Sequence, residues 1–591
     1  MINQSVGRII AAAVSMLAAA FAPCAARTVN LDGTWDFRFD EGKTLEDVAS
    51  PAFEATTKIV VPGCWNAMPR WYDKHGTGQY RRRFSLDTDV ADAFLVVDGC
   101  GLRAKFWVDG REVGFDKLPW SRVEFSTGPL KAGEHEVTAA VDSVVDAKKV
   151  KMFYSHYDFF PYGGFYHGVW LETQKSPVEL RRLIVRTRDY RTGRVEIEAQ
   201  FAGSGAPEDF EAQVSFDGCA ATPVKFAGRR AALEVPSFKT WSPDEPNLHF
   251  VAVSWAGRTV RQRFGVRQVC TAGGRITLNG KPIYLKGFGR HESHVGFGAA
   301  TPVQTMYEDV TNVKEMGGNF IRGAHYPQCD QFLDVCDELG VMVWEESLGW
   351  QNGVKHFTDP EFCALQTEQT RLMARNSINH PCVVISGFLN EAQFGAQSGR
   401  KLVDELIGAI RAEDTGHLVA YACSLWAKDI CNLNTDVIAY NAYPCWYTHN
   451  LVTGSNEEMR RNIKSCHEEI IRHFRKRYPD GRPIIVSESG VKADYGVHDP
   501  RGRTQFSEDF QAEYERTMLE VLFGMKDVAG IAIWQLADSR SWVRRHNAMI
   551  NRAYGMNTGG VFDSYRRPKL ASKAVREMFR RPGPLHDQGK K

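Results

Sequence analysis

The chain has 591 residues, which is too long for one hydrophobic core and suits roughly three or four domains. Apolar residues make up 43% and charged residues 24%, as in an ordinary globular protein, so no large disordered tract is expected. The formal net charge is only +2 and the basic residues are spread along the chain, which argues against nucleic acid or an anionic membrane as the main partner.

Residues 1–26 have the pattern of an export signal. Arg8 precedes an apolar run over 9–22, and small residues continue to Ala26. A basic start, a short apolar stretch and an Ala-x-Ala-type end are typical of a signal peptide. The run is too short to be a comfortable membrane span. We therefore expect an exported protein, periplasmic or secreted, that does not act at a membrane.

The thirteen cysteines do not suggest a disulfide framework. Cys24 would leave with the signal peptide, and the other twelve are irregularly spaced, often inside apolar runs such as the one that begins at Cys382. We expect most of them to be buried as small hydrophobic side chains.

Two β-rich domains are expected before the chain changes character. Residues 27–175 contain short strands separated by turn residues, for example 80–84 and 93–97, which predicts a jelly-roll β-sandwich of the sugar-binding kind. Residues 176–268 continue the alternation over 183–185 and 195–198. Their length fits an immunoglobulin-like β-sandwich of ~100 residues.

Residues 269–591 are predicted to form a (β/α)8 TIM barrel, so the whole chain is multidomain. Strand candidates are 283–285, 320–321, 341–344, 383–388, 418–422, 437–440, 484–487 and 531–535. Amphipathic helices are expected at 303–316, 328–339, 360–379, 400–413, 457–478 and 506–525. Eight such β–α units in about 300 residues fit this barrel, whose chemistry lies at the carboxyl ends of the strands.

Two of these strand ends carry a carboxylate. The apolar run 383–389 leads into Asn390 and Glu391, and the run 483–487 leads into Glu488. One such Glu alone could equally be a rim charge that answers an Arg. Two of them, on the fourth and seventh strands, converge on the barrel mouth. Retaining glycoside hydrolysis needs two carboxyl groups ~5 Å apart, one as acid/base and one as nucleophile.

Several segments of the sequence resemble glycoside hydrolase family 2, within it the β-glucuronidase-like branch. The resemblance spans nearly the whole chain after the signal, including the domain order. It is densest at Gly287-Phe288-Gly289-Arg290-His291-Glu292, Arg322-Gly323-Ala324-His325-Tyr326-Pro327, Asn390-Glu391, Asn441-Ala442-Tyr443 and Ile484-Ile485-Val486-Ser487-Glu488. Together these segments are specific, although none is specific alone.

The resemblance implies a role for each site residue. Glu391 is expected to be the acid/base and Glu488 the nucleophile, with Asn390 bound to the sugar 2-hydroxyl and Tyr443 orienting Glu488. Four further residues are expected to line the sugar pocket: His325, Asn441, Tyr447 and Trp534. Asp158 matches a sugar-contacting Asp that the first sandwich delivers to the barrel mouth. Core packing for Trp534 and a loop cap for Asp158 are the structural alternatives.

No metal or organic cofactor is expected. The segment His291-Glu292-Ser293-His294 invites a metal interpretation, but its histidines are three apart and follow a strand and a Gly-rich turn, whereas a zinc-protease helix needs them at i and i+4. The resemblance instead places Arg290 and His291 in supporting roles.

One departure from the family pattern leaves the sugar open. β-Glucuronidases bind the substrate carboxylate with an Asn-x-Lys pair after the last strand, and here Asn557 is kept while the Lys is replaced by Gly559. A carboxylate buried without a cation loses several kcal/mol. An Arg fork could replace the Lys and bind a galacturonide or glucuronide; the candidates are Arg540, Arg544, Arg545 and Arg552. The broken motif slightly favours a neutral sugar such as a β-galactoside.

The sequence thus predicts an exo-acting retaining β-glycosidase that removes one terminal sugar from a carbohydrate substrate. The first alternative is a β-glucuronidase or β-galacturonidase. An alternative of another class is a non-catalytic carbohydrate-binding protein, against which the retention of both carboxylates counts. A homo-oligomer is expected only by analogy with the family.

Overall fold

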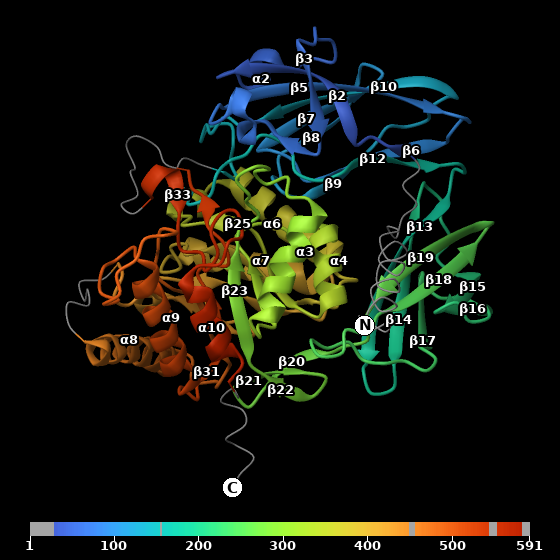
Figure 1. Ribbon diagram of the computed structural model, residues 1–591. Helices are drawn as coiled ribbons and strands as arrows, with labels where there is room; N and C mark the ends of the chain where they lie inside the picture. Colours follow the sequence, from blue (N-terminus) through green and yellow to red (C-terminus); the bar gives the residue numbers. More distant parts are fainter. Residues whose placement is uncertain (1–28, 154–156, 448–454, 543–551, 582–591) are drawn as a thin grey trace, which may run out of the picture.

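The computed structural model describes residues 29–153, 157–447, 455–542 and 552–581. The predicted signal peptide and Cys24 lie outside these ranges. The described chain is multidomain, as predicted, with a β-sandwich above a barrel and a second sandwich beside it (Figure 1).

The first domain is a sandwich of two antiparallel sheets. One sheet has the order β3-β2-β5-β10-β7-β8 and the other β1-β12-β6-β9. Their bounds are β1 Val29–Asn30, β2 Gly33–Glu41, β3 Thr57–Val61, β5 Gly76–Leu86, β6 Asp92–Asp98, β7 Arg103–Val108, β8 Arg111–Asp116, β9 Arg122–Ser126, β10 Gly133–Asp142 and β12 Val169–Gln174. The minor elements are α2 Leu45–Val48, β4 Gly63–Cys64, η1 Trp65–Ala67, η2 Pro69–Trp71 and β11 Gly164–Phe165. Side chains from both sheets, such as Trp35 and Leu171, share one core.

The second domain is a smaller sandwich. Its sheets have the orders β13-β14-β17 and β16-β15-β18-β19. The strands are β13 Glu179–Asp189, β14 Arg194–Ala202, β15 Phe210–Phe216, β16 Thr222–Phe226, β17 Arg230–Glu234, β18 His249–Trp255 and β19 Arg258–Phe264. Ile197 and Val253 meet in its core, and burial alternates along both strands, as expected for sheets with one solvated face.

The third domain is a parallel barrel. It begins with a small antiparallel sheet of β20 Val269–Ala272, β21 Arg275–Leu278 and β22 Lys281–Ile283. The barrel strands are β23 Leu285–Arg290, β24 Phe320–Gly323, β25 Met342–Trp350, β26 Val383–Asn390, β27 Leu418–Ala420, β28 Ala422–Cys423, β29 Ile438–Asn441, β30 Ile484–Ser489 and β31 Val528–Ile533. The sheet order runs from β27 through β23 and β31 to β28. β27 and β28 are two halves of one strand, interrupted at Tyr421, so the two ends of the sheet meet there.

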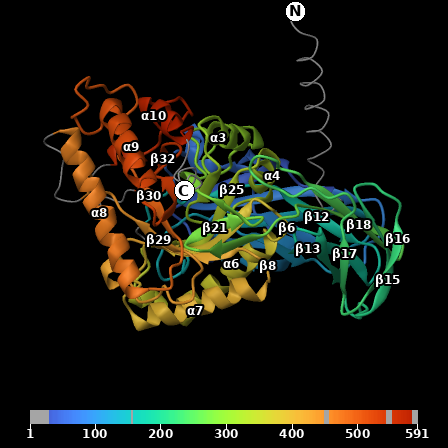
Figure 2. The same ribbon diagram turned by 90° about the horizontal axis from the view of Figure 1, so that it is seen from below.

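The barrel helices lie outside the strands (Figure 2). They are α3 Val303–Glu315, α4 Asp330–Leu339, α6 Pro360–Asn376, α7 Gln397–Ala412, α8 Asn456–Arg477, α9 Glu508–Phe523 and α10 Leu570–Phe579, with a short α5 at Val354–Phe357. The fifth unit departs from the ideal barrel, because β28 and β29 are joined through a 3-10 turn, η3 at Trp426–Lys428, and residues 424–437 contain no α-helix. The remaining short elements are β32 Ser539–Arg540, η4 Ala553–Gly555 and β33 Met556–Asn557.

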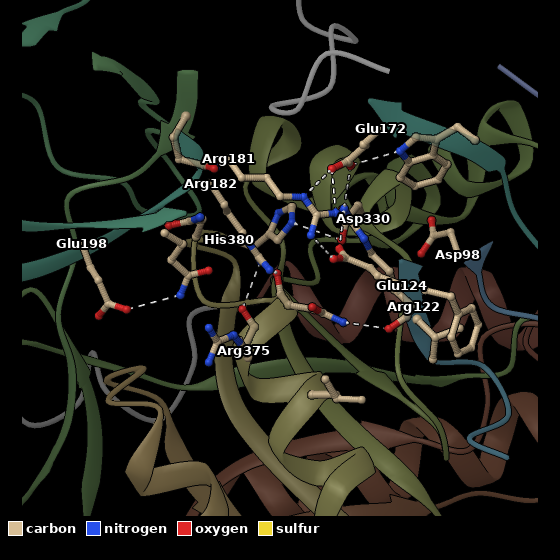
Figure 3. A pocket seen from close by; sticks show the side chains of 18 of the residues that line it. Asp98, Arg122, Glu124, Glu172, Arg181, Arg182, Glu198, Asp330, Arg375 and His380 are labelled. Atoms are coloured by element: carbon tan, nitrogen blue, oxygen red, sulfur yellow. Dashed lines mark hydrogen bonds and ion pairs between the residues drawn. The ribbon is translucent and has the colours of Figure 1, made fainter. Parts of the chain in front are cut away.

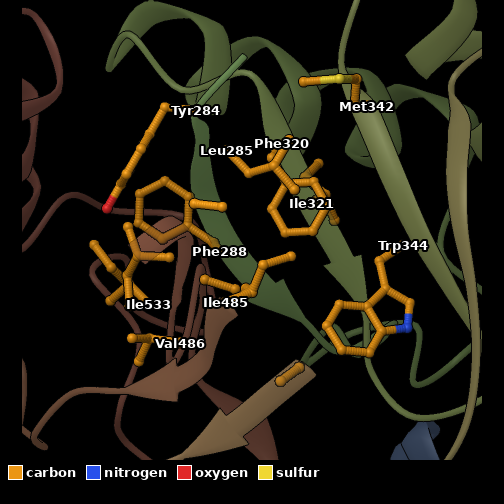
Figure 4. Close-up of a cluster of buried hydrophobic side chains, with 14 of the residues drawn as sticks. Tyr284, Leu285, Phe288, Phe320, Ile321, Met342, Trp344, Ile485, Val486 and Ile533 are labelled. Atoms are coloured by element: carbon orange, nitrogen blue, oxygen red, sulfur yellow. The ribbon is translucent and has the colours of Figure 1, made fainter. Parts of the chain in front are cut away.

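The barrel strands are apolar on both faces because side chains fill the inside and helices cover the outside. Every residue of β26 and β30 is buried. Figure 4 shows part of the resulting core, where Phe288, Ile321, Ile485 and Ile533 from four strands pack together. A rigid core of this kind fixes the strand ends and the residues that follow them.

Ion pairs dock the second sandwich onto the barrel. Arg263 of β19 contacts Glu338 at 2.6 Å and Asp337 at 3.2 Å, both on α4. The indole nitrogen of Trp241 donates to the carbonyl of Asp337. Charge-assisted contacts therefore tie this edge of the sandwich to α4.

The twelve cysteines in the described ranges are free thiols, eight of them buried. Among the described helices, none is long and apolar enough to cross a membrane.

Candidate active site at the mouth of the barrel

Glu391 and Glu488 lie at the carboxyl ends of two barrel strands. Glu391 directly follows β26, and Glu488 is the fifth residue of β30. Glu488 is 4% exposed, and it stands opposite Asn441 in the pairing of β29 with β30. The strand register therefore brings Asn441 beside the second carboxylate.

Arg322 organises the floor of the site. Its guanidinium, fully buried at the end of β24, contacts Oε1 of Glu488 at 2.7 Å and Oε1 of Glu346 at 2.7 Å. It also donates to Oδ1 of Asn390 at 2.8 Å. Burial opposes ionisation of Glu346, but Arg322 and His325 together outweigh it and lower the pKa of that carboxyl.

Burial has the largest effect on the ionisation of Glu488. Burial raises the pKa of Glu488 to about 8, Arg322 works against this rise, and the charge of Glu391 adds to it. Tyr443 donates a hydrogen bond of 2.5 Å to Oε2 of Glu488. Burial and the adjacent carboxylates hold the pKa of Tyr443 well above its usual value, so this hydroxyl stays protonated and acts as the donor.

A chain of hydrogen bonds joins the two carboxylates. Asn441 donates through Nδ2 to Oε1 of Glu391 at 3.0 Å and to Oδ1 of Asn390 at 3.1 Å. Asn390 also accepts from Arg322, which contacts Glu488. The chain Glu391–Asn441–Asn390–Arg322–Glu488 places both carboxyl groups at one site.

Within the described part of the chain, the side chain of Asn390 has an unsatisfied hydrogen-bond donor. Its side chain is fully buried, and within the described part of the chain its Nδ2 atom has no hydrogen-bond partner. A buried amide without a partner costs ~1–3 kcal/mol. A sugar hydroxyl at this position would satisfy it, which supports the predicted contact to a 2-hydroxyl.

Trp534 and His325 form one wall. Their rings stack at 5.4 Å with an interplanar angle of 5°. An added Cβ at Gly289 would come within 2.7 Å of the Trp534 ring, so this glycine leaves the space that the indole occupies. His325 bonds Glu346 through Nδ1 at 2.8 Å, and burial lowers the pKa of His325, which favours the neutral imidazole.

Asp158 reaches the barrel from the first sandwich. Its carboxylate accepts from Nε of Arg552 at 2.6 Å and from Nδ2 of Asn557 at 3.1 Å. The hydroxyl of Ser541 and Nη2 of Arg552 also contact it. Asp158 is 7% exposed, so its charge is matched by a buried guanidinium. These contacts tie the first sandwich to the segment that follows the last barrel strand.

Tyr447 packs beside Tyr443, the residue that donates to Glu488. Its ring contacts the ring of Tyr443 at 5.2 Å, and the ammonium of Lys492 lies 5.5 Å from its centroid. Burial raises the pKa of the Tyr447 hydroxyl, and the nearby charge of Arg552 opposes that rise. The backbone amide of Ala493, the residue after Lys492, donates to the carbonyl of Thr558, which lies next to Asn557 in the sequence.

A family model described as "Glycosyl hydrolases family 2, TIM barrel domain" matches residues 269–581. The chain belongs to glycosyl hydrolase family 2. This family 2 chain is similar to the β-glucuronidase of Sus scrofa, with 26% identity over 617 residues that cover 93% of this chain and 90% of the relative. It is also similar to the β-galactosidase of Thermoanaerobacter pseudethanolicus, with 27% identity over 390 residues, 61% of this chain and 50% of the relative.

A crystal structure of a family 2 β-galacturonidase from Eisenbergiella tayi, bound to galacturonate, superposes with a TM-score of 0.83. The two chains are 27% identical, and the match covers 93% of this chain and 96% of that one. The family 2 chain is therefore a glycoside hydrolase that acts on carbohydrate, and its relatives are β-glycosidases.

Sequence reasoning gave no role to three residues that the structure places in the site. Arg322 belongs to the segment 322–327, one of those that carry the family resemblance. Glu346 follows the strand-like run 341–344, just as Glu391 follows an apolar run. Gln351 follows β25 and reaches Glu391. A neutral residue in a loop carries no periodic sequence signal, so the sequence alone does not predict that Gln351 contacts Glu391.

The arginines considered for a substrate carboxylate are placed as follows. Arg552 is bound to Asp158. Arg540 contacts Asp73 and lies 3.7 Å from the Phe160 ring, against the first sandwich. Arg544 and Arg545 lie outside the described residues.

The segment considered for a metal packs into a domain interface. Glu292 bonds His167 of the first sandwich at 3.1 Å and accepts from Thr301, while Cys329 lies nearby. Burial opposes the charge on His167, but its buried neighbours, Cys329 and Glu292, hold its pKa well above its usual value. An ion pair of His167 with Glu292 accounts for these contacts.

A cavity of about 950 Å³ lies where the three domains meet, and neither Glu391 nor Glu488 lines it (Figure 3). Its charged groups bind one another: Arg122 contacts Asp330 at 2.7 Å. Arg182 donates to the carbonyls of residues 375 and 376, at the carboxyl end of α6. We assign this cavity to domain docking.

Proposed function

We propose that this family 2 enzyme is an exo-acting retaining β-glycosidase that works by double displacement. The observation that carries the proposal is the chain of hydrogen bonds that joins Glu391 to Glu488 through Asn441, Asn390 and Arg322. Two carboxyl groups at one site, in different surroundings, are what a nucleophile and an acid/base require.

In the first step, Glu488 attacks the anomeric carbon and forms a covalent ester with the sugar. The glycosidic C–O bond breaks, and Glu391 gives its proton to the departing oxygen. Arg322 and Tyr443 both bind Glu488, so they favour its ionised form and assign the attack to it. Glu391 is only partly buried, as a group that must meet the leaving group and then water has to be.

In the second step, Glu391 removes a proton from water, and the water oxygen attacks the anomeric carbon. The ester bond breaks, Glu488 regains its negative charge, and the sugar leaves with its original anomeric configuration. The unpartnered Nδ2 atom of Asn390 supports a bond to the sugar that strengthens as charge develops.

The exo-acting character rests on Asp158. Because this side chain of the first sandwich meets Arg552 and Asn557 of the barrel, we infer that one end of the mouth is closed. A pocket closed at one end accepts a chain terminus.

Wild type and Glu488→Gln assayed on aryl β-glycosides test this function. We expect turnover by wild type, a loss of at least about 10³-fold in Glu488→Gln, and the β-anomer as first product by NMR. The α-anomer as first product would overturn the retaining mechanism. Absence of turnover on every sugar would favour a carbohydrate-binding protein.

The sugar proposed first is neutral, such as a terminal β-galactoside. Arg552 offers two of its donors to Asp158, so the Arg fork is engaged with the protein's own carboxylate. Asp158 also brings negative charge to this end of the pocket, which disfavours a substrate carboxylate. A β-galactosidase is among the relatives.

A second candidate is a β-uronide, and Lys492 favours it. Its ammonium lies beside Tyr447, and its loop is hydrogen-bonded to Thr558, next to the position where the Asn-x-Lys cation is missing. Lys492 would then supply the missing charge from the loop after β30. Relatives that match over nearly the whole chain are named β-glucuronidase and β-galacturonidase.

A further inference from the structure

Gln351 occupies a constrained position directly after β25. Its φ of 51° lies in the left-handed region that non-glycine residues rarely adopt. Its amide donates to the carbonyl of Asn390 at 2.8 Å, which ties the loop after β25 to the end of β26. The side chain is thereby aimed at the residue that follows Asn390.

That residue is Glu391, and Gln351 contacts it directly. Nε2 of Gln351 donates to Oε2 of Glu391 at 3.1 Å, while Asn441 donates to Oε1 at 3.0 Å. Each carboxylate oxygen therefore has one neutral amide donor. Glu391 itself has a φ of 54°, also in the left-handed region.

We propose that Gln351 is a positioning residue for the acid/base: it holds the Glu391 carboxyl group in place for both of its proton transfers. This inference rests on the proposed function. Asn441 cannot supply the same effect alone, because it binds one oxygen and leaves rotation about the last side-chain bond open. Two donors on opposite oxygens fix the carboxyl plane.

The chemistry of double displacement gives this contact a specific consequence. The first step needs Glu391 protonated, and the second needs it ionised to take a proton from water. Both transfers need the carboxyl group within hydrogen-bond reach of the reacting oxygen. Gln351 therefore assists both steps by keeping the carboxyl plane in one orientation.

Gln393 provides a matched control in the same pair of loops. Its amide donates to the carbonyl of Asn352, and its side chain accepts from the amide of Val354. Among the described contacts of Gln393, none is to Glu391. Substitution of Gln393 by Met removes only the contact to the Val354 amide, whereas substitution of Gln351 removes a donor from Glu391.

The test compares Gln351→Met, Gln351→Glu and Gln393→Met with wild type. The profile of kcat/KM against leaving-group ability should fall about tenfold at the poor-leaving-group end in Gln351→Met, and further in Gln351→Glu, whose carboxylate repels that of Glu391. On an activated aryl glycoside, Gln351→Met should lower kcat about tenfold and kcat/KM much less, because only the second step is slowed. Gln393→Met should match wild type.

A Gln351→Met profile that overlays wild type would overturn the proposal, and so would an equal fall in Gln393→Met. Glu391→Ala separates this failure from that of the proposed function. If its activity loss is far smaller on activated substrates, the acid role of Glu391 holds and only Gln351 is in question. Equal loss on all leaving groups would remove the acid role itself.

Discussion

Tyr443 and Glu488 share a hydrogen bond of 2.5 Å in which the phenol is the donor. Tyr443 follows β29 and Glu488 lies in β30, so the contact is built into the pairing of two neighbouring strands. Arg322 occupies the other carboxylate oxygen. The two donors oppose the rise in pKa that burial imposes on Glu488.

Replacement of Tyr443 by Phe should therefore raise the Glu488 pKa further. The acidic limb of kcat/KM, where Glu488 must be ionised, is expected to move to higher pH, and the maximum should fall by about 10²-fold. The check is a pH profile of kcat/KM. Tyr440→Phe is the control, since Tyr440 bonds buried His467 instead. An unmoved acidic limb in Tyr443→Phe would contradict this account.

Stability should also depend on Glu488 and pH. The folded-state pKa is about 8, above the usual value of 4.5, so the folded protein binds this proton more tightly than the unfolded chain does. The resulting stabilisation is full below pH 4.5 and is lost as the pH rises through 8. Glu488→Gln has no carboxyl group to ionise, so it does not lose this stabilisation as the pH rises. The Tm of Glu488→Gln relative to wild type should therefore be higher at pH 8 than at pH 5. A Tm difference that shrinks with rising pH would argue against the raised pKa.

Much of the architecture is predictable from the sequence because burial imposes a simple pattern on strands. The runs before Glu391 and Glu488 are apolar on both faces, as parallel barrel strands must be, and each ends in a carboxylate. The fifth barrel unit is less predictable, since residues 424–437 carry no helical apolar period and form only a 3-10 turn.

Contacts between distant segments were not accessible in the same way. The family resemblance assigned Asp158 to the site, and Arg552 was one of four candidate arginines, but neither showed that the two bind each other, because the pair joins different domains. Glu346 and Gln351 act through side-chain contacts of about 3 Å that no spacing rule encodes. Local pattern predicts elements, whereas the partners of polar side chains depend on tertiary packing.

Asp158→Asn should both destabilise the enzyme and weaken it. The change leaves the buried guanidinium of Arg552 without its carboxylate, a loss of roughly 3–5 kcal/mol for a broken buried pair. We expect a lower Tm and a fall in kcat/KM. Asp73→Asn is the matched control, because it breaks the pair with Arg540 at a side chain that is 66% exposed, worth about 0–1 kcal/mol. Equal effects of the two substitutions would refute the role of the Asp158 pair.

Lys492 should decide the sugar class. Wild type and Lys492→Met are to be compared on aryl β-galactoside, glucuronide and galacturonide. If the enzyme binds an acid sugar through Lys492, the substitution lowers kcat/KM on that uronide by about 10²-fold and changes the galactoside little. If the neutral sugar is the substrate, wild type favours the galactoside and the substitution affects all three sugars alike. A uronide preference that survives Lys492→Met would exclude this lysine.

The most direct test of the central claim is to trap the covalent intermediate. Wild type would be incubated with the 2-deoxy-2-fluoro derivative of its fastest aryl β-glycoside, digested and mapped by mass spectrometry. The account predicts one added sugar per chain, attached to the peptide that contains Glu488, and no adduct in Glu488→Gln. An adduct on another residue, or time-dependent turnover with no adduct at all, would contradict it.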